Sequence, residues 1–240
     1  NKIGYQIYPK SFQDTNGDGI GDLKGITAHL DDLANLGINV IWICPINKSP
    51  MKDHGYDISD YEEIDPMFGC KDDLRELIQE ADKRRIKILM DLVVNHTSSE
   101  HPWFQKAMDE PNGEYGKYYI IQEGKDGKEP NNWRSIFGGS AWEQIKDTNL
   151  YYLHLFTKWQ PDLNWENPIL RQRIYDMVNR WLDLGISGFR IDAISHLKKD
   201  LTYKNLPSDS VDGFVNGFPY FSNVNGIGTC FRFCGNRPQG

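Results

Sequence analysis

An arginine and an aspartate stand two residues apart in the segment GFRIDAI, residues 188–194, where apolar and polar residues alternate. Residues two apart in a β-strand point to the same face, so Arg190 and Asp192 are expected to lie side by side. A guanidinium group there would hold the neighbouring carboxylate in its ionised form. An ionised aspartate on a rigid strand is the nucleophile that covalent glycoside hydrolysis requires. A buried Arg–Asp pair without chemistry is the alternative that the spacing leaves open.

Polar residues also accompany the apolar segment IKILMDLVV, residues 86–94. Asp91 lies inside this segment, and Asn95 and His96 follow it directly. At the carboxyl end of a parallel barrel strand, such side chains are candidates for catalysis or substrate binding. For His96 the alternative is a hydrogen-bonded residue without a catalytic role, and its surroundings lack the spacing of a metal site.

The tripeptide Gly55-Tyr56-Asp57 combines an aromatic ring with a carboxylate. A tyrosine can stack on the flat face of a sugar, while an aspartate accepts hydrogen bonds from two hydroxyl groups. A surface turn is the simpler interpretation of three residues taken alone.

The loop DTNGDGIGD has oxygen-bearing groups at the spacing of a calcium-binding loop. Asp14, Asn16 and Asp18 occupy loop positions 1, 3 and 5 of that pattern. Ile20 can offer its carbonyl at position 7, and Asp22 its carboxylate at position 9. Position 12, a glutamate in an EF-hand, is glycine here. The loop is therefore predicted to bind a hard cation without being an EF-hand, and an Asp-rich turn without an ion is the alternative.

The elements that must position these residues alternate along most of the chain. Apolar runs of strand length predict four buried strands, and apolar residues at helical spacing predict three helices. Asn167 and Pro168 are typical of a helix N-cap and first position. The strands are expected at residues 3–8, 38–44, 86–94 and 188–194, and the helices at 25–36, 71–84 and 167–185. This alternation predicts right-handed crossovers and a parallel sheet.

The alternation stops between about residues 95 and 165, where Gly, Pro, Asn and aromatic residues are frequent and no clean helical face is present. A structureless loop of this length is uncommon in a compact domain. We therefore predict that this segment is a small inserted domain.

Composition excludes some classes of partner. The 240 residues suffice for a substantial hydrophobic core. The net charge of -7 argues against nucleic acid or an anionic membrane as the main partner. No apolar run approaches the ~18 residues of a membrane-spanning helix, and the start of the sequence has no signal-like apolar core. A cytoplasmic protein without a targeting segment is expected.

Seven segments of the chain, in order, resemble glycoside hydrolase family 13, the α-amylase family, and more narrowly its oligo-1,6-glucosidase and α-glucosidase subgroup. The segments are QIYPKSF, DTNGDGIGDL, GYDISDY, DLVVNHTSSEHPWF, FGGSAW, QPDLNWENP and GFRIDAI. The resemblance covers residues 1 to about 200, and QPDLNW is characteristic of the subgroup.

The resemblance implies a (β/α)8 TIM barrel, domain A, with a small domain B inserted after the third strand. These residues would supply about the first four β/α units. The implied division is residues 1–96 for the first part of domain A, 97–165 for domain B and 166–240 for the continuation of domain A.

The resemblance also implies roles in the site. Asp192 would be the nucleophile, fixed by Arg190, and His96 would bind substrate. Asp57 would grip the terminal glucose while Tyr56 stacks against it. The implied reaction is the retaining release of glucose from the non-reducing end of short α-1,6 or α-1,4 gluco-oligosaccharides. The pocket lining would include Gln160, Phe137 and Phe156, and Ca²⁺ would bind at Asp14, Asn16, Asp18, Ile20 (through its carbonyl) and Asp22.

Two segments of the family pattern are not found among these residues. One is V-G-E, which carries the general acid, and the other is N-H-D, which carries a transition-state-stabilising His and Asp. The 240 residues are therefore expected to be a fragment that is inactive by itself. A half barrel would leave the strands at residues 3–8 and 188–194 as open edges. The final stretch GTCFRFCGNRPQG also departs from the helix expected there.

The residue after the implied nucleophile is Ala193. In this subgroup valine at that place accompanies α-1,6 bonds, and alanine or threonine accompanies α-1,4 bonds. We therefore expect maltose-type substrates to be accepted, along with isomaltose. The alternatives among enzymes are a sucrose isomerase or a trehalose-6-phosphate hydrolase. The alternative from another class is a non-catalytic relative, either a calcium-dependent sugar-binding module or a transporter-associated subunit.

Overall fold

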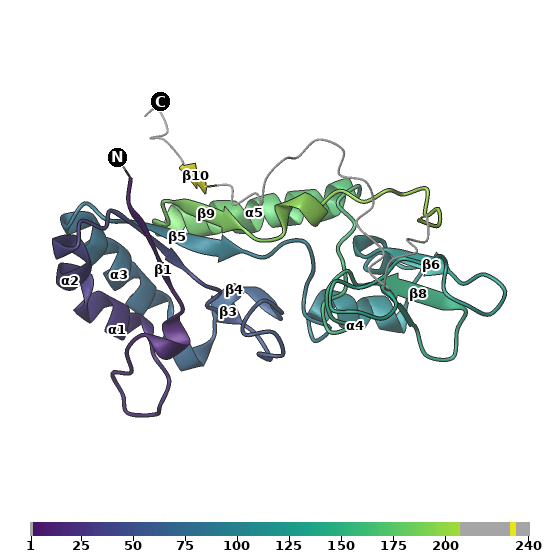
Figure 1. Cartoon of the computed structure of the whole chain (residues 1–240), viewed down its shortest axis with the longest axis horizontal. Coiled ribbons are helices and arrows are strands. Elements are labelled where there is room, and N and C mark those ends of the chain that lie inside the picture. Colours follow the sequence, from purple (N-terminus) through teal and green to yellow (C-terminus); the bar gives the residue numbers. More distant parts are fainter. Residues whose placement is uncertain (1, 207–230, 234–240) are drawn as a thin grey trace.

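The computed structural model describes residues 2–206 and 231–233, and its centre is a five-stranded sheet (Figure 1). Four strands run parallel in the order β1-β2-β5-β9, as the sequence predicts. The strands are β1 (Gly4–Ile7), β2 (Val40–Ile43), β5 (Lys87–Leu92) and β9 (Gly188–Ile191). Together with the helices between them, they form the first part of a (β/α)8 barrel.

The fifth strand, β10 (Phe231–Phe233), pairs with β9 in the antiparallel direction. The expectation of two open edges is therefore wrong for β9 and holds for β1, which pairs only with β2 among the described strands. Most of the stretch GTCFRFCGNRPQG lies outside the described residues.

The helix expected at residues 25–36 is two short helices, α1 (Leu23–Ala28) and α2 (Leu30–Asn35). His29 separates them because its backbone leaves the helical region, with φ -102° and ψ 10°. The first helix also begins earlier than expected, since the Asp22 carboxylate accepts the Gly25 N–H and forms its N-cap.

The two longer helices agree with the sequence pattern. They are α3 (Lys71–Lys83) and α5 (Pro168–Leu184). Asn167 caps α5 by accepting the N–H groups of Ile169 and Leu170. Gly185 ends the helix at φ 119°, a conformation that glycine adopts without strain. The apolar face of α5 is buried at Leu170, Ile174, Met177 and Trp181.

The chain between β5 and β9 contains its own three-stranded antiparallel sheet, in the order β6-β8-β7. A second hydrophobic cluster, separate from the main core, includes Trp133, Trp142 and Leu153. Figure 1 shows this segment at the right, away from α1–α3. Its elements are α4 (Pro102–Asp109), η3 (Gly116–Tyr118), β6 (Ile121–Glu123), β7 (Trp142–Gln144) and β8 (Leu150–Leu153). The sequence pattern missed α4, and the domain limits at residues 96 and 165 stay predictions.

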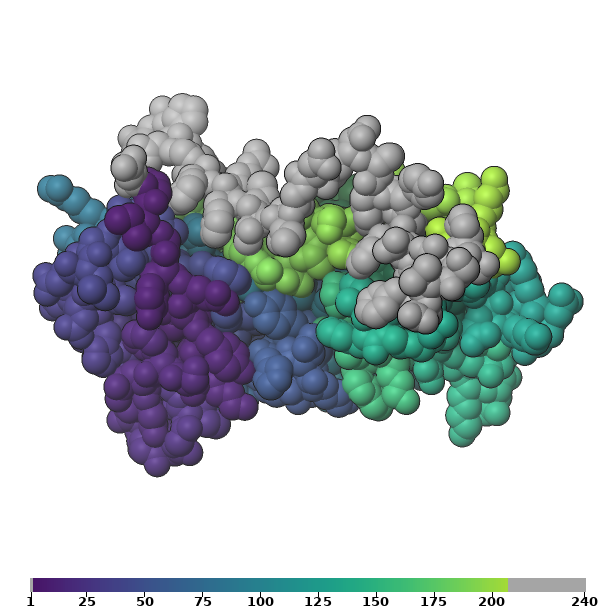
Figure 2. All heavy atoms as spheres, viewed as in Figure 1, coloured from purple at the N-terminus to yellow at the C-terminus, as the bar shows by residue number. Residues whose placement is uncertain are grey.

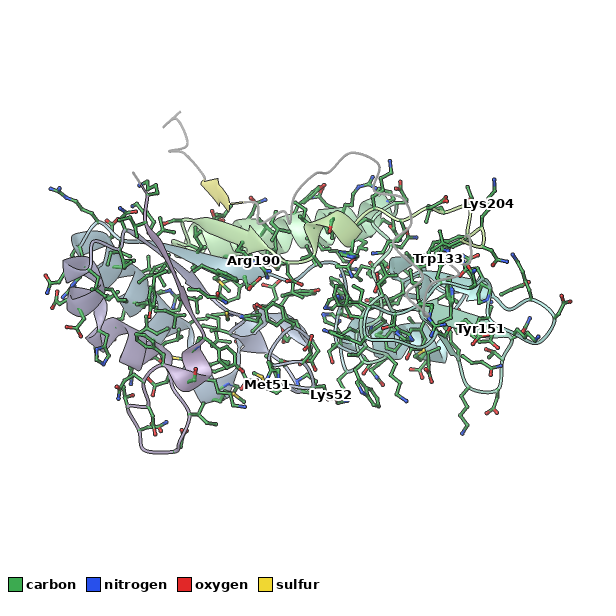
Figure 3. All side chains as sticks on the ribbon, viewed as in Figure 1. Met51, Lys52, Trp133, Tyr151, Arg190 and Lys204 are labelled. Carbon is green, nitrogen blue, oxygen red and sulfur yellow. The ribbon has the colours of Figure 1, made fainter. Side chains whose placement is uncertain are left out.

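The two ends of this inserted segment lie against each other. His96 and Asp162 form an antiparallel bridge, and the Leu163 N–H donates to the Asn95 carbonyl at 2.9 Å. Figure 2 shows the segment that follows η4 (Ile194–His196), in yellow-green, lying against the inserted segment, in teal. There the Trp133 indole N–H donates to the Lys204 carbonyl at 3.0 Å, and both residues are labelled in Figure 3.

Short elements that the sequence pattern did not predict complete the described chain. The strands β3 and β4 form an antiparallel hairpin beside the sheet. The elements are β3 (Asn47–Lys48), β4 (Asp60–Ile64), η1 (Pro9–Ser11), η2 (Pro66–Phe68) and η4 (Ile194–His196). Within residues 2–206 and 231–233, no helix combines the length and apolar character that crossing a membrane requires.

Candidate active site

Three charged side chains meet at the carboxyl ends of β5 and β9. Asp91 and Arg190 are partners in the parallel register of these strands. The Nη1 atom of Arg190 lies 3.0 Å from Asp91 Oδ1 and 2.6 Å from Asp192 Oδ1. The side-by-side placement of Arg190 and Asp192 expected from the alternation is confirmed. Figure 3 labels Arg190 near the middle of the molecule, between the sheet and the inserted segment.

Asp91 belongs to this cluster, although the sequence pattern assigned it no role more specific than that of a candidate side chain at the end of a strand. Its side chain is fully buried, and it also accepts hydrogen bonds from Trp42 Nε1 and the Tyr56 hydroxyl, each at 3.0 Å. Burial raises the pKa of Asp91 to about 6, against the opposing effect of Arg190. The signal that points to it is a lone carboxylate inside an apolar strand, which has to be paired to be buried.

Asp192 is the more accessible carboxylate of the two. Its side chain is 16% exposed, while that of Asp91 is 0% exposed. The Asp192 N–H donates to the Leu92 carbonyl at 3.0 Å, which continues the β5–β9 pairing to this residue. A carboxylate held on a strand end, paired with one guanidinium and partly exposed, can be reached by a substrate, as a nucleophile requires.

A second group of polar side chains surrounds His96, which is 1% exposed. Its Nε2 atom lies 2.9 Å from the Tyr56 carbonyl oxygen and 3.2 Å from Gln160 Nε2. The Phe156 ring packs on it with centroids 5.1 Å apart. The structure thus brings together His96, Tyr56, Gln160 and Phe156, as expected.

Gln160 is fully buried and holds the residues around His96 in place through its hydrogen bonds. Its amide nitrogen donates to Asp53 Oδ2 at 2.8 Å and to the Tyr56 carbonyl at 3.0 Å, and its oxygen accepts from Thr157. Gln160 therefore orients neighbouring groups and presents no surface to a pocket, which differs from the expected lining role.

Asp57 does not take the position expected of a sugar-gripping residue. It is 0% exposed, and its carboxylate accepts hydrogen bonds from the Ser49 hydroxyl and from the N–H groups of Lys52 and Asp53. Those bonds hold the loop before it and leave the side chain no access to a ligand. Asp53, four residues earlier, is half-buried and faces Gln160 instead. Sequence reasoning missed Asp53, and three residues taken as a motif gave no sign of it.

The aromatic residues expected at the site differ in exposure. The Tyr56 hydroxyl donates to Asp91, and its ring lies 5.9 Å from the Arg190 guanidinium, so the ring supports the charged cluster. Phe137 is 64% exposed and packs on Phe156 with centroids 6.1 Å apart. Stacking of Tyr56 on a sugar stays a prediction.

Ala193 follows Asp192 at the start of η4, and its backbone is left-handed, with φ 46° and ψ 34°. Non-glycine residues adopt this conformation rarely, and β-branched ones very rarely. The turn directs the chain away from β9 immediately after the carboxylate. Ala193 is half-buried beside the site.

The loop from Asp14 to Asp22 curls around its own side chains. Asp14 accepts the N–H groups of Asn16, Gly17 and Gly19, and these hydrogen bonds lower its pKa. Asp18 accepts the Ile20 N–H at 2.8 Å. Gly17 and Gly19 have φ of 82° and 86°, which permits the tight path.

Asp22 sits at the end of that loop with its carboxylate engaged. It accepts from Thr15 through both the N–H and the hydroxyl, and from Gly25 as the N-cap of α1. Across the described part of the chain, no three His, Cys, Asp or Glu side chains are grouped to hold a metal ion. Calcium binding by the carboxylate, amide and carbonyl oxygens of this loop stays a prediction.

Comparison with known proteins agrees with this architecture. Residues 6–224 match the family model described as alpha amylase, catalytic domain. The chain is 53% identical over 94% of its length to the probable oligo-1,6-glucosidase 3 of Bacillus subtilis (strain 168), covering 41% of that protein. It is 58% identical to the glucan 1,6-alpha-glucosidase of Streptococcus dysgalactiae subsp. equisimilis, over 81% of this chain and 35% of that protein.

Two solved structures are similar as well. The trehalose-6-phosphate hydrolase of Bacillus licheniformis has a TM-score of 0.85 and 46% identity, over 91% of this chain and 39% of that one. The trehalulose synthase of Pseudomonas mesoacidophila MX-45 has a TM-score of 0.83 and 48% identity, over 85% of this chain and 37% of that one. The chain thus spans roughly two fifths of the length of the relatives it matches. It belongs to the α-amylase family, glycoside hydrolase family 13, among relatives that are oligo-1,6-glucosidases and α-glucosidases.

Proposed function

We propose that the protein carrying this chain is a retaining, exo-acting α-glucosidase that releases glucose from short α-1,6 and α-1,4 gluco-oligosaccharides. The observation that carries the proposal is the accessible Asp192 carboxylate, held 2.6 Å from Arg190 at the end of β9. The relatives named oligo-1,6-glucosidase support the same substrate class. A cytoplasmic location is part of the proposal.

In the first step, one Asp192 oxygen attacks the anomeric carbon while the bond from that carbon to the leaving oxygen breaks. The leaving oxygen takes a proton from a general acid, and water later releases glucose from the enzyme with its α configuration. Arg190 keeps the attacking carboxylate oriented through their 2.6 Å hydrogen bond. His96 and Asp53 are proposed to bind hydroxyl groups of the sugar. Because these 240 residues contain no V-G-E segment, we propose that they are inactive by themselves.

The test uses the full-length protein with isomaltose, maltose and a nitrophenyl α-glucoside. We expect glucose to be released first as the α anomer, which ¹H NMR of the early reaction detects. Release of the β anomer would contradict a retaining mechanism, and the absence of any release would contradict the proposal. Incubation with sucrose separates the alternatives, because an isomerase yields an isomeric disaccharide. Cleavage restricted to trehalose 6-phosphate would favour the phosphosugar hydrolase.

We propose that Ala193 sets the bond preference. Ala193→Val is expected to raise the ratio of kcat/KM for isomaltose to that for maltose by about tenfold, the scale of one or two methyl groups in an apolar pocket. Ala193→Gly is the matched control, since glycine keeps the left-handed backbone and adds no side chain. An unchanged ratio in a folded Val variant, checked by circular dichroism, would remove this role from Ala193.

We also propose that the loop from Asp14 to Asp22 holds one Ca²⁺ ion. Asp14, Asn16, Asp18 and the Ile20 carbonyl would supply oxygens, and Asp22 retains a free lone pair while it caps α1. The hydrogen bonds that Asp14 accepts keep its carboxylate ionised, which supports a cation there.

This cation is expected to stabilise the fold, because a ligand that binds only the native state raises Tm. Added Ca²⁺ should raise Tm of the parent protein by several degrees and leave that of Asp14→Asn unchanged. Asp147→Asn, at an exposed aspartate of the inserted segment, is the control and should respond like the parent. Equal responses of Asp14→Asn and the parent would locate any Ca²⁺ elsewhere.

A further inference from the structure

A buried ion pair lies directly behind His96. The Lys199 ammonium group is 2.9 Å from Asp162 Oδ2, and the two side chains are 1% and 0% exposed. The same ammonium donates to Asn95 Oδ1 at 2.7 Å. Lys199 follows η4, Asn95 follows β5 and Asp162 closes the inserted segment, so three separate parts of the chain converge here. Burying such a pair is costly unless its geometry is good and further hydrogen bonds satisfy its remaining donors and acceptors.

Chemistry fixes the orientation of the Asn95 amide between these two charges. An ammonium group can only donate hydrogen bonds, and a carboxylate can only accept them. The Asn95 oxygen must therefore face Lys199, and its nitrogen must face Asp162 Oδ2, at 3.2 Å. The reversed amide would place two donors together and two acceptors together.

The oriented amide then determines what His96 can do. Asn95 Nδ2 lies 3.1 Å from His96 Nδ1. The two N–H bonds of this nitrogen serve Asp162 and His96, so His96 Nδ1 has to be the acceptor. In a neutral imidazole the other nitrogen then carries the proton. That nitrogen, Nε2, faces the Tyr56 carbonyl oxygen at 2.9 Å, which accepts it.

The opposite side of the ring agrees with this assignment. Gln160 lies 3.2 Å from His96 Nε2 through its amide nitrogen. Both of its N–H bonds have other acceptors, Asp53 Oδ2 and the Tyr56 carbonyl, and its oxygen accepts from Thr157. The Gln160 amide group therefore does not need His96 Nε2 as an acceptor. A proton on Nε2 can then donate to the Tyr56 carbonyl.

We propose that Lys199 is a positioning residue which, through Asn95 and together with Asp162, holds His96 as the tautomer protonated at Nε2. The Nε2–H then donates to the Tyr56 carbonyl, on the side of Gln160 and Asp53. Under the proposed function a bound sugar oxygen shares this donor with the Tyr56 carbonyl, and only that last step rests on the proposed function. The tautomer itself is a property of the folded protein without substrate.

The experiment is ¹⁵N NMR of the full-length protein labelled on histidine rings, at neutral pH and without substrate. His96→Gln identifies the His96 signals by their loss. We expect Nε2 to carry the proton and Nδ1 to have the shift of an unprotonated nitrogen. In Asn95→Asp a carboxylate faces Nδ1, so Nδ1 is expected to become protonated. Asn112→Asp adds the same charge at an exposed site and should leave the His96 signals unchanged.

Lys199→Met tests the part assigned to the lysine. Without the ammonium group the Asn95 oxygen loses its fixed partner, and a population with the proton on Nδ1 is expected to appear. Lys199→Arg should restore the single tautomer, and Lys198→Met, at the exposed neighbour, should not change it. A parent protein protonated at Nδ1 would overturn the proposal, and a folded Lys199→Met with the parent spectrum would remove Lys199 from it. Because no readout requires turnover, these outcomes are independent of whether the protein is a glucosidase.

Discussion

Asp192→Asn is expected to lower kcat of the full-length protein on a nitrophenyl α-glucoside by about 10⁴-fold or more, the scale of losing a group that reacts covalently. The amide cannot form the glycosyl-enzyme bond. Its neutral oxygen can still accept the hydrogen bond from Arg190, but the charge attraction of the carboxylate is lost. Steady-state kinetics measure the loss, and circular dichroism checks that the variant is folded.

A second measurement identifies the covalent step. A fluorinated glucosyl inactivator should add one glucosyl mass to the parent protein, on the peptide that contains Asp192, and none to Asp192→Asn. Asp200→Asn is the matched control, because Asp200 is exposed and its carboxylate accepts a hydrogen bond from the Thr202 N–H. If Asp192→Asn kept parent activity, or if the label appeared on another peptide, Asp192 would not be the nucleophile.

Arg190→Met is expected to lower the free energy of unfolding by about 3–5 kcal/mol, since it removes one partner of a buried ion pair. The side chain of Asp91 is 0% exposed, and Arg190 is the cation that lies against it. Urea unfolding at neutral pH measures the change. The control is Arg180→Met, which removes a surface pair with Glu62, both side chains being about half exposed. A change of about 0–1 kcal/mol is expected there.

The pH dependence of this deficit distinguishes a charge effect from lost packing. Burial raises the pKa of Asp91 to about 6, above its value in the unfolded chain. A carboxyl group raised in the folded state contributes stability that is present below the unfolded value and is lost as pH rises through the folded value. The destabilisation by Arg190→Met should therefore be smaller at pH 4 than at pH 7. A deficit equal at both pH values, or absent at pH 7, would contradict an uncompensated Asp91 charge.

The sequence allowed the sheet to be predicted because its evidence is local. The inner strands β2 and β5 are buried on both faces over most of their length, so Ile41, Ile43 and their equivalents form continuous apolar runs. The edge strand β1 is exposed at every position but its last. The boundaries of α5 were predictable for the same reason, since Asn167 and Gly185 are caps that act within their own turn. The break at His29 was not, because the apolar spacing continues across it while the backbone changes direction.

The site was harder to predict, because a side chain's role depends on partners distant in sequence. Arg190 and Asp192 were found through alternation, which is local. Asp57 and Asp53 are four residues apart and have the same side chain. Asp57 accepts hydrogen bonds within its own loop, whereas Asp53 accepts one from Gln160, more than a hundred residues later. The Lys199 ion pair likewise joins segments that no local pattern relates.

The contact between the two ends of the inserted segment also bears on how the chain folds. Pairing β5 with β9 requires closing a long loop, and the entropic cost of closure rises with the logarithm of loop length. Once Asn95 and Leu163 are hydrogen-bonded, the residues between them no longer add to the length of the loop that must be closed. The effective loop is then roughly threefold shorter, which lowers the entropic cost of closing it by about 1 kcal/mol. An insertion that folds first therefore lets the sheet assemble at nearly the entropic cost of an uninterrupted β/α unit.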